Sequence, residues 1–468
     1  MLSSCFAGVR RFTSEARRLS SGKEGKVTAV LGAQWGDEGK GKLADVLAKN
    51  YDLVCRFNGG TNAGHTVVVG DKKFAFHLLP CGLVYPHTMN LLGHGVVVDL
   101  EAMFGELEPL NGEGVEWQGR LLISDRAHLL FDYHKIIDGI IENRRTTGGG
   151  TALGTTKKGI GPAYASKANR TGLRVGQLKH MASFKRAFRK SVEQQQLLYD
   201  FEYDVQACLD KCACWFDDML PQVEPMIVDG VAYVNQAYRD NKKIITEGAN
   251  ALMLDLDAGT YPFVTSSPTL AGGIATGLGL SPDKVDTVMG VAKAYTTRVG
   301  AGPFPTELSD ERSGGDKPLN APGSDIGLHM QTVGAEFGVT TGRKRRCGWL
   351  DLVVLQYSHM LNNYSGINLT KLDVLDDLEE VRIGVKYRLH GEDLPLGAMP
   401  STLEDLASVE VEYETMPGWQ TSTAHCRTFE EMPPEAQAYV TRIEDILGCP
   451  VSWIGVGAGR EDMVTRFE

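Results

Sequence analysis

Short apolar runs recur along the chain, and they are followed by small or charged residues. They are Val27–Leu31, Val96–Leu100, Lys243–Thr246, Thr287–Val291, Leu352–Leu355 and Ile367–Leu369. Runs of this length favour buried β-strands. Helical periodicity marks two longer segments between them, Tyr133–Asn143 and Phe184–Tyr203. The alternation predicts an α/β protein, which we expect to be a single large domain around a mostly parallel central β-sheet.

Two stretches, Thr146–Gly161 and Thr260–Gly279, hold too much glycine and threonine to be simple helices or strands. Long irregular segments in a compact domain usually carry function or close over a ligand. No linker composition divides residues 27–468, so we expect one catalytic domain there. Residues 1–26 differ, because they hold four arginines and five serines but only two acids. This composition fits either an organelle transit peptide or a disordered basic tail.

Composition narrows the class of protein further. The net charge of −11 disfavours a general role on nucleic acid or on a membrane surface. No apolar stretch approaches the roughly 20 residues that a membrane helix needs. Cys208, Cys212 and Cys214 cluster, but no histidine or paired C-x-x-C motif accompanies them. Free thiols in a reducing compartment explain such cysteines better than a metal site does.

The first candidate for chemistry is the loop Gly36–Lys42, which lies between the predicted strand Val27–Leu31 and the helical pattern Leu43–Ala48. A strand, a glycine-rich turn and a helix together aim backbone N–H groups and a lysine at phosphate. The match to the common phosphate loop is partial, because Leu43 stands where Ser or Thr would hold magnesium. The loop also contains the acidic pair Asp37-Glu38, which would repel phosphate. We therefore expect an acid here to bind a metal, to act as a base, or both.

Two further loops carry candidate residues. Asn58–Thr66 is rich in glycine, which lets backbone approach a ligand closely, and its His65 is either a catalytic acid or a structural residue. Thr370-Lys371-Leu372-Asp373 directly follows a predicted strand. An aspartate at this site can accept from N1–H and the 2-amino group of guanine together, a donor pair that adenine lacks. The alternative is an ordinary surface turn.

The segment Thr340–Arg346 ends in four cations and precedes an apolar segment, so it more plausibly lines an anion pocket than a solvated face. Arg298, the lysine-rich Thr155–Gly159 and Arg170 are further anion-binding candidates. Together these motifs indicate phosphoryl transfer from GTP with magnesium, at least one more anionic substrate, and an Asp and a His at the reacting centre. They do not identify the acceptor.

Taken together, the motifs resemble one family, adenylosuccinate synthetase, in its eukaryotic form. The resemblance covers nearly all of the chain from Val27 onward. The segments that carry it are Gln34–Lys42, Asn62–Thr66, Gly154–Pro162, Gly259–Ser267, Thr297–Glu307, Thr340–Asp351 and Thr370–Asp373.

This resemblance implies a GTP-dependent ligase that joins IMP to L-aspartate through 6-phosphoryl-IMP, the first committed step of AMP synthesis from IMP. Asp37 would remove the N1 proton of IMP, and His65 would act as the general acid while Lys40 meets the phosphates. Mg²⁺ would be held by the Asp37 carboxylate and the backbone carbonyl of Gly64, which accounts for Leu43. Arg170 would reach IMP in the neighbouring subunit, which implies a homodimer with shared sites. We expect a cytoplasmic enzyme, with an organelle-targeting role for residues 1–26 left open.

The resemblance also implies binding residues for each substrate. GTP would contact Gly36, Glu38, Gly39, Lys40, Gly41, Lys42, Gly64, His65, Thr66, Arg345, Lys371, Leu372, Asp373, Gly455 and Gly457. IMP would contact Asp37, Lys40, Asn62, Ala63, Gly64, His65, Thr156, Arg170, Asn250, Thr265 and Arg343. L-Aspartate would contact Val339, Thr340, Thr341, Gly342, Arg343, Lys344 and Arg345. Asn250 stands where bacterial members have glutamine, so its reach to the base would be shorter.

Two other classes of function stay open at this point. One is a GTP-driven switch that binds a partner and makes no product. The other is an inactive relative that serves as a scaffold, against which the intact Asp37, Lys40, His65, Arg343 and Asp373 argue. A GTP turnover that requires both IMP and aspartate separates a ligase from either.

Overall fold

The structure, a computed structural model, describes residues 27–69, 72–149, 152–210, 220–308, 325–338, 342 and 344–466. Contacts within the chain divide it into two compact units. The first unit contains the described residues of 27–43, 250–264 and 286–466. The second unit contains residues 44–249 and 265–285.

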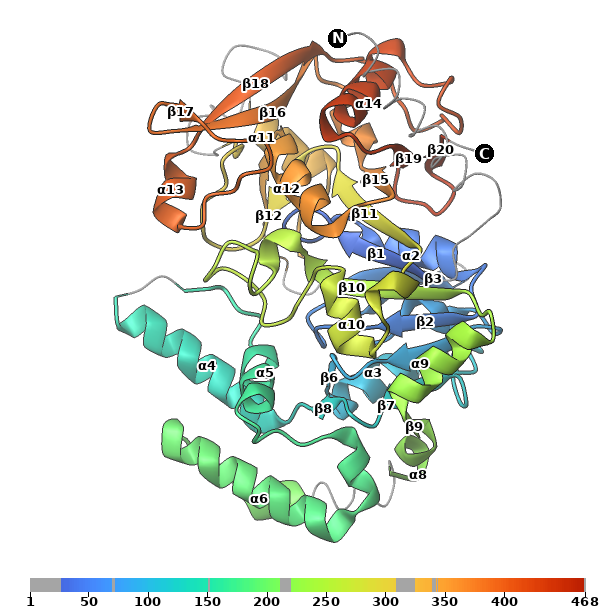
Figure 1. Ribbon diagram of the computed structural model, residues 1–468, viewed down its shortest axis with the longest axis vertical. Helices are drawn as coiled ribbons and strands as arrows, with labels where there is room; N and C mark the ends of the chain where they lie inside the picture. Colours follow the sequence, from blue (N-terminus) through green and yellow to red (C-terminus); the bar gives the residue numbers. More distant parts are fainter. Residues whose placement is uncertain are drawn as a thin grey trace. The chain divides into compact units, whose positions relative to one another are not determined.

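In the first unit, parallel strands form the sheet that positions the phosphate loop (Figure 1). In spatial order they are β20 (Met463–Thr465), β19 (Val451–Gly455), β15 (Gly366–Thr370), β11 (Thr287–Lys293) and β1 (Val27–Gly32). Only β20 runs antiparallel to its neighbour. The carboxyl ends of β19, β15, β11 and β1 therefore lie at one edge, where ligand-binding loops of α/β proteins gather.

Helices and smaller sheets complete the first unit. The helices are α11 (Ile326–Val333), α12 (Leu352–Asn362), α13 (Leu403–Ser408) and α14 (Pro434–Leu447), with α2 (Lys40–Ala48) leading into the second unit. The short helices are η4 (Leu252–Leu254) and η7 (Leu372–Leu375). The remaining strands are the pair β12 (Thr296–Arg298) and β13 (Arg346–Gly348), and β14 (Leu350–Asp351), β16 (Glu380–Leu389), β17 (Glu392–Asp393) and β18 (Glu410–Pro417).

The second unit has parallel strands of its own. In spatial order they are β10 (Ile244–Ala251), β2 (Leu53–Arg56), β5 (Met89–Leu92), β7 (Leu121–Ser124) and β9 (Ile227–Val228). Two small pairs are β3 (His65–Val69) with β4 (Lys72–Phe76), and β6 (Val97–Val98) with β8 (His128–Leu129). The loop Asn58–Gly64 follows the carboxyl end of β2.

The second unit contains seven described α-helices. They are α3 (Leu100–Asn111), α4 (Asp132–Thr147), α5 (Ile160–Ala168), α6 (Met181–Leu198), α8 (Leu220–Val223), α9 (Gly230–Arg239) and α10 (Gly272–Leu278). The short helices are η1 (Cys81–Val84), η2 (Val175–Lys179), η3 (Glu224–Met226) and η5 (Pro282–Lys284). The largest described apolar core of this unit takes residues from α3, α4, α6 and α8, and in it the rings of Tyr133 and Phe188 lie 6.0 Å apart.

The predicted α/β class with a mostly parallel sheet is confirmed. Four of the predicted strands are present as β1, β10, β11 and β15, with bounds that differ by a few residues. The helix Tyr133–Asn143 is confirmed as α4, and Phe184–Tyr203 is helical as far as Leu198, where α6 ends. One catalytic domain over residues 27–468 stays a prediction, and the extension 1–26 lies outside the described residues.

One predicted strand is wrong and another is shorter than predicted, for one physical reason. Leu352–Leu355 is the first turn of α12, whose N-cap Asp351 accepts from the N–H of Val354 at 3.3 Å. Of Val96–Leu100, only Val97–Val98 is extended, because Asp99 caps α3 by accepting from the N–H of Ala102 at 3.1 Å. An aspartate cap starts a helix, and periodicity cannot tell a short buried helical run from a strand.

The predicted irregular segments are mixed in structure. Thr146–Gly161 includes the end of α4 and the start of α5, and Thr260–Gly279 contains α10. The described cysteines, Cys208 among them, form no disulfide with one another, and the prediction for the cluster stays a prediction because Cys212 and Cys214 lie outside the described part. None of the helices among the described residues has the length and hydropathy to cross a membrane.

Candidate active site

The phosphate loop after β1 has an unusual backbone conformation. Gly36, Asp37 and Gly39 have φ angles of 96°, 60° and 89°. Glycine adopts such angles freely, and aspartate is one of the few other residues that tolerate them. The Asp37 side chain is 37% exposed, so its carboxylate faces outward from the loop. Strained backbone of this kind persists where the surrounding structure enforces it, typically at functional sites.

Glu38 holds this loop from the inside. It is buried, and it accepts from the backbone N–H groups of Gln34 at 3.1 Å and Gly36 at 2.8 Å. Its other oxygen pairs with the Lys40 ammonium at 2.7 Å. The two neighbouring acids thus differ in placement, since Glu38 shapes the turn while Asp37 is available to a ligand. A contact of Glu38 with GTP stays a prediction.

The separate GTP motifs meet in the first unit. The Thr370 hydroxyl donates to the backbone carbonyl of Glu38 at 2.7 Å, which joins the phosphate loop to the predicted guanine motif. Lys42 donates to the carbonyls of Gly457 and Asp462, each at 3.0 Å. Burial lowers the pKa of Lys42, although Asp462 and Asp373 oppose this. The structure therefore brings together segments that lie more than 300 residues apart in sequence.

The guanine motif ends in a buried, open acceptor. Lys371 has a φ of 59° and precedes η7, which contains Leu372 and Asp373. The Oδ1 atom of Asp373 is buried and has no hydrogen-bond partner within the described part of the chain. Burial, and then the charge of Asp376, raise the pKa of Asp373. An unsatisfied buried carboxylate oxygen is costly, and guanine N–H donors would satisfy it.

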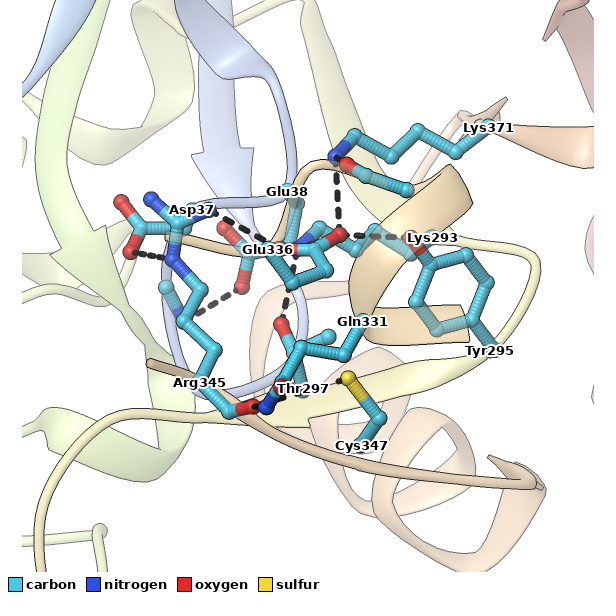
Figure 2. A network of polar contacts seen from close by, with 12 residues as sticks. Asp37, Glu38, Lys293, Tyr295, Thr297, Gln331, Glu336, Arg345, Cys347 and Lys371 are labelled. Atoms are coloured by element: carbon cyan, nitrogen blue, oxygen red, sulfur yellow. Dashed lines mark hydrogen bonds and ion pairs between the residues drawn. The ribbon is translucent and has the colours of Figure 1, made fainter. Parts of the chain in front are cut away.

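A second group of charges surrounds Glu336, a buried residue after α11 (Figure 2). Its carboxylate accepts from Lys293 and Lys371, each at 2.8 Å, from Arg345 at 2.9 Å and from the Tyr295 hydroxyl at 2.5 Å. Burial raises the pKa of Glu336, but the charges of Lys293 and Lys371 outweigh it and bring the pKa down to about 2. Glu336 is therefore ionised, and sequence reasoning missed it because no local motif marks it.

Arg345 connects this group to the phosphate loop. Its Nε donates to the Asp37 carboxylate at 2.8 Å while its Nη1 donates to Glu336, as Figure 2 shows. The Arg345 side chain is only 9% exposed and Glu336 is fully buried, so water screens their bond little, whereas the Asp37 side chain is 37% exposed and its bond to Arg345 is screened more. The structure thus places Arg345 between the candidate base and a buried carboxylate.

The ends of the predicted aspartate loop are held together. Phe337 and Lys344 form an antiparallel bridge, and the Arg345 N–H donates to the Glu336 carbonyl at 2.9 Å. Between them, the Gly342 N–H donates to the Gly338 carbonyl at 2.8 Å. The other predicted residues of this loop lie outside the described part: Val339, Thr340, Thr341 and Arg343.

In the second unit, two predicted IMP residues make a direct contact. Asn62 donates from Nδ2 to the Thr265 hydroxyl at 3.2 Å and accepts from the Gly60 N–H at 2.9 Å. Lys158 donates to the Thr61 carbonyl at 2.7 Å, which ties the lysine-rich loop to the same turn. Gly64 is exposed, and no atom lies within 4 Å of where its Cβ would be.

His65 begins β3 and is 3% exposed. Its Nδ1 lies 3.4 Å from the Cys81 sulfur and 3.9 Å from a Glu247 carboxylate oxygen. Burial raises the pKa of Glu247 to about 7, opposed by the charge of Arg56. Polar groups thus fix one side of the imidazole ring. Sequence reasoning missed Cys81 and Glu247. Glu247 directly follows the predicted strand Lys243–Thr246, and an acid at the end of a buried strand could have indicated a functional residue.

Two further IMP candidates of this unit are Thr156, which lies in the loop before α5, and Arg170, which follows α5. The Gly154 N–H donates to Glu142 at 2.7 Å and the Gly159 N–H to Asp138 at 2.9 Å, so two acids of α4 hold the loop that contains Thr156. Thr156 is exposed. Arg170 is also exposed, and it follows α5 with a φ of 61°.

A sequence profile described as adenylosuccinate synthetase matches residues 29–464. The chain belongs to the adenylosuccinate synthetase family. An adenylosuccinate synthetase of Mycosarcoma maydis is 52% identical over 447 residues, which are 94% of this chain and 97% of the relative. One from Paramecium tetraurelia is 49% identical over 453 residues, 95% and 99% of the two chains.

Solved structures agree with this family. A fully ligated adenylosuccinate synthetase from Plasmodium falciparum superposes with a TM-score of 0.86 at 44% identity, covering 94% of this chain and 100% of that one. A succinoaminodeoxyadenylate synthetase of cyanophage S-2L has a TM-score of 0.56 at 18% identity, covering 94% and 95%, so it shares the fold.

Adenylosuccinate synthetases are ligases, and this chain's reaction is the GTP-dependent joining of IMP and L-aspartate to adenylosuccinate, with GDP and phosphate as the other products. The cofactor of the family is Mg²⁺. Carboxylate and carbonyl oxygens are the hard ligands that Mg²⁺ prefers, and neither Asp37 nor Gly64 is buried. The donor chemistry of these two residues therefore fits the ion.

Proposed function

We propose that Asp37 and His65 carry the chemistry of the ligation. Asp37 removes the proton from N1 of IMP, which makes O6 a nucleophile. O6 then bonds to the γ-phosphorus as the bond to the β–γ bridging oxygen of GTP breaks, with His65 donating to the developing charge. The amino group of L-aspartate next attacks carbon 6, and phosphate leaves. Oxygen is a poor leaving group until it is phosphorylated, so two easier steps replace one hard step.

Several observations on the Asp37 loop support its part in this proposal. Its carboxylate is partly exposed, sits on a strained turn, and is held by Arg345 at 2.8 Å. Asp37 and the Gly64 carbonyl would hold Mg²⁺, which when bound neutralises phosphate charge. Lys40, paired with Glu38 at 2.7 Å, would meet the phosphates. A lysine fixed in this way needs little reorganisation when charge moves.

The observation that carries the GTP assignment is the open acceptor at Asp373. Its buried Oδ1 lies in the segment that is tied to the phosphate loop by Thr370. In the proposal, Asp373 accepts from guanine while Lys371, Leu372, Gly455 and Gly457 complete the pocket. The contacts of Lys42 with the Gly457 and Asp462 carbonyls support a pocket shared by these segments.

Asp373→Asn is therefore expected to raise the KM for GTP by about tenfold to a hundredfold, since hydrogen bonds to a charged group contribute roughly 1.5–3 kcal/mol. Xanthosine triphosphate should become the better substrate, because its carbonyl at carbon 2 can accept from the new amide. The measurement is kcat/KM for GTP, ATP and xanthosine triphosphate. Asp377→Asn, an exposed acid of the same segment, is the control. Equal use of ATP and GTP by the unmodified protein would contradict the assignment.

For IMP and L-aspartate, we propose binding sets on separate loops. The contact of Asn62 with Thr265 at 3.2 Å supports a common role for these two with IMP. The 5′-phosphate and base contacts are completed by Ala63, Thr156, Asn250, Arg170 and Arg343. The loop from Val339 to Arg345 closes on L-aspartate, and the bridge between Phe337 and Lys344 would fix its base.

We further propose a homodimer in which Arg170 serves the neighbouring subunit's IMP. Its exposure at the end of α5 supports this, because an exposed guanidinium is free to grip a phosphate in another chain. Arg170→Leu is expected to raise the KM for IMP far more than that for GTP. At an IMP concentration too low for the Arg170→Leu protein to be active, mixing it with the inactive Asp37→Asn protein should restore up to about a quarter of wild-type activity. Half of freely exchanged dimers are mixed, and each has one intact site of two.

The mixing experiment needs a measure of subunit exchange, such as mixed dimers carrying two affinity tags. Confirmed exchange without restored activity would show that Arg170 acts within its own subunit or away from IMP. Arg174→Leu, a second exposed arginine near α5 with no proposed role, is the matched control. We also propose a cytoplasmic location for the enzyme, which the reducing environment implied by its free thiols supports.

A further inference from the structure

We propose that Glu336 is a positioning residue that serves two substrates at once, by holding Lys371 for the guanine nucleotide and Arg345 for L-aspartate and the phosphates. The inference rests on the proposed binding roles of Lys371 and Arg345. Glu336 is not itself among the residues assigned to any ligand. It acts through its two cationic partners.

The geometry shows one carboxylate shared between two binding segments. Oε1 accepts from Lys371 Nζ and Oε2 from Arg345 Nη1, at 2.8 and 2.9 Å. Lys371 follows β15, whereas Arg345 precedes β13, so nothing local in the sequence sets their separation. Figure 2 shows the carboxylate lying between them. Both cations therefore have their positions fixed by the same buried group.

Glu336 is itself held firmly. Lys293, fully buried at the end of β11, donates to both carboxylate oxygens at 2.8 Å, and Tyr295 donates to Oε1 at 2.5 Å. Lys293 is anchored in turn by the Thr297 hydroxyl at 2.8 Å. A side chain with this many buried partners has one orientation, which is the condition for precise placement of the groups that it binds.

Lys371 and Arg345, unlike the fully buried Lys293, are placed where they can reach a ligand. Lys371 is 33% exposed, and Arg345 extends past Glu336 to Asp37. A long flexible side chain loses rotamer freedom when it binds an anion, and a partner that orders it beforehand reduces that cost. Glu336 should thus improve binding of the guanine nucleotide and of L-aspartate, while IMP, whose proposed contacts lie mostly elsewhere, should gain little.

The alternative is that Glu336 only neutralises Lys293. Glu336→Gln alone cannot separate the two roles, because it leaves Lys293 buried without a counter-charge and can unfold the protein. The double variant Glu336→Gln/Lys293→Met removes that stranded charge with a side chain of similar length. If Glu336 were only a counter-ion, the double variant would behave like the wild type in every ligand measurement.

The experiment measures melting temperature and three dissociation constants by calorimetry. These are GDP binding, L-aspartate binding to enzyme saturated with IMP and GDP, and IMP binding. GDP carries no γ-phosphate, so no reaction interferes. In the double variant we expect the Kd for GDP and for L-aspartate each to rise about tenfold or more, the scale of one lost charged hydrogen bond, and the Kd for IMP to change less than about threefold. Glu307→Gln, which removes the partner of the neighbouring Arg346, is the matched control.

The possible results distinguish a failure of this inference from a failure of the binding roles on which it rests. Wild-type affinity for GDP and L-aspartate in the folded double variant overturns the inference, as does an equal loss for all three ligands. Lys371→Met and Arg345→Leu test the underlying roles separately. If these two variants bind GDP and L-aspartate normally, the proposed binding roles are wrong and the inference falls with them. If they bind weakly while the double variant binds normally, only the inference is wrong.

Discussion

Replacing Asp37 with asparagine is expected to abolish adenylosuccinate formation while leaving the fold intact. The amide cannot take the N1 proton of IMP, and it is a poorer Mg²⁺ ligand than a carboxylate. Loss of a general base typically costs about 10² to 10⁴ in rate, and more when the same group also holds a metal. The measurement is the initial rate of adenylosuccinate formation from IMP, GTP, L-aspartate and Mg²⁺, followed by absorbance.

Asparagine is the right substitution for this test. Asp37 has a φ of 60°, which asparagine tolerates but most other residues do not. The side chain is partly exposed, so the loss of its ion pair with Arg345 should lower the melting temperature only slightly. Asp393→Asn removes an exposed ion pair with Lys386 and should leave the rate unchanged. An Asp37→Asn protein that keeps more than about a tenth of the wild-type kcat would rule out Asp37 as the base.

His65→Asn is expected to lower kcat by about 10² to 10⁴ with little change in the KM for IMP or GTP. The asparagine amide takes the position of the ring's Nδ1 side, near Cys81 and Glu247, but it has no group in place of Nε2. The variant thus retains the inner contacts and loses the atom that would donate to the reacting oxygen. A transition-state contact shows in kcat rather than in KM.

The buried position of His65 makes a stability control necessary. The smaller side chain leaves a cavity, so the melting temperature should fall. His359→Asn alters a partly buried histidine, which accepts from the Tyr364 N–H at 3.1 Å, and should lower stability without lowering kcat. The general-acid role would be excluded if the folded His65→Asn protein retained near wild-type kcat, or if only its KM values rose.

Local sequence was sufficient where backbone geometry is set within one continuous segment. Glycine at positions 36 and 39 permits the positive φ angles found there, and the alternation of apolar runs predicted the parallel α/β class. The starts of two helices with aspartate N-caps could not be predicted from the apolar pattern. Asp99 and Asp351 each start a helix inside an apolar run, and the run alone fits a strand equally well.

What the sequence by itself determined is the set of candidate motifs: the predicted phosphate loop, the predicted guanine motif and the glycine-rich loop with His65. Only the tertiary structure decided their partners. Glu38 is buried while Asp37 is exposed. Glu336 accepts hydrogen bonds from Lys371 and Arg345, and Glu247 and Cys81 lie beside His65. The contact of Arg345 with Asp37 spans 308 positions, and that of Thr370 with Glu38 spans 332. A motif reflects the backbone geometry of one short segment. Which buried charged residues contact each other depends on the order of the strands in the sheet, and no local sequence pattern specifies that order.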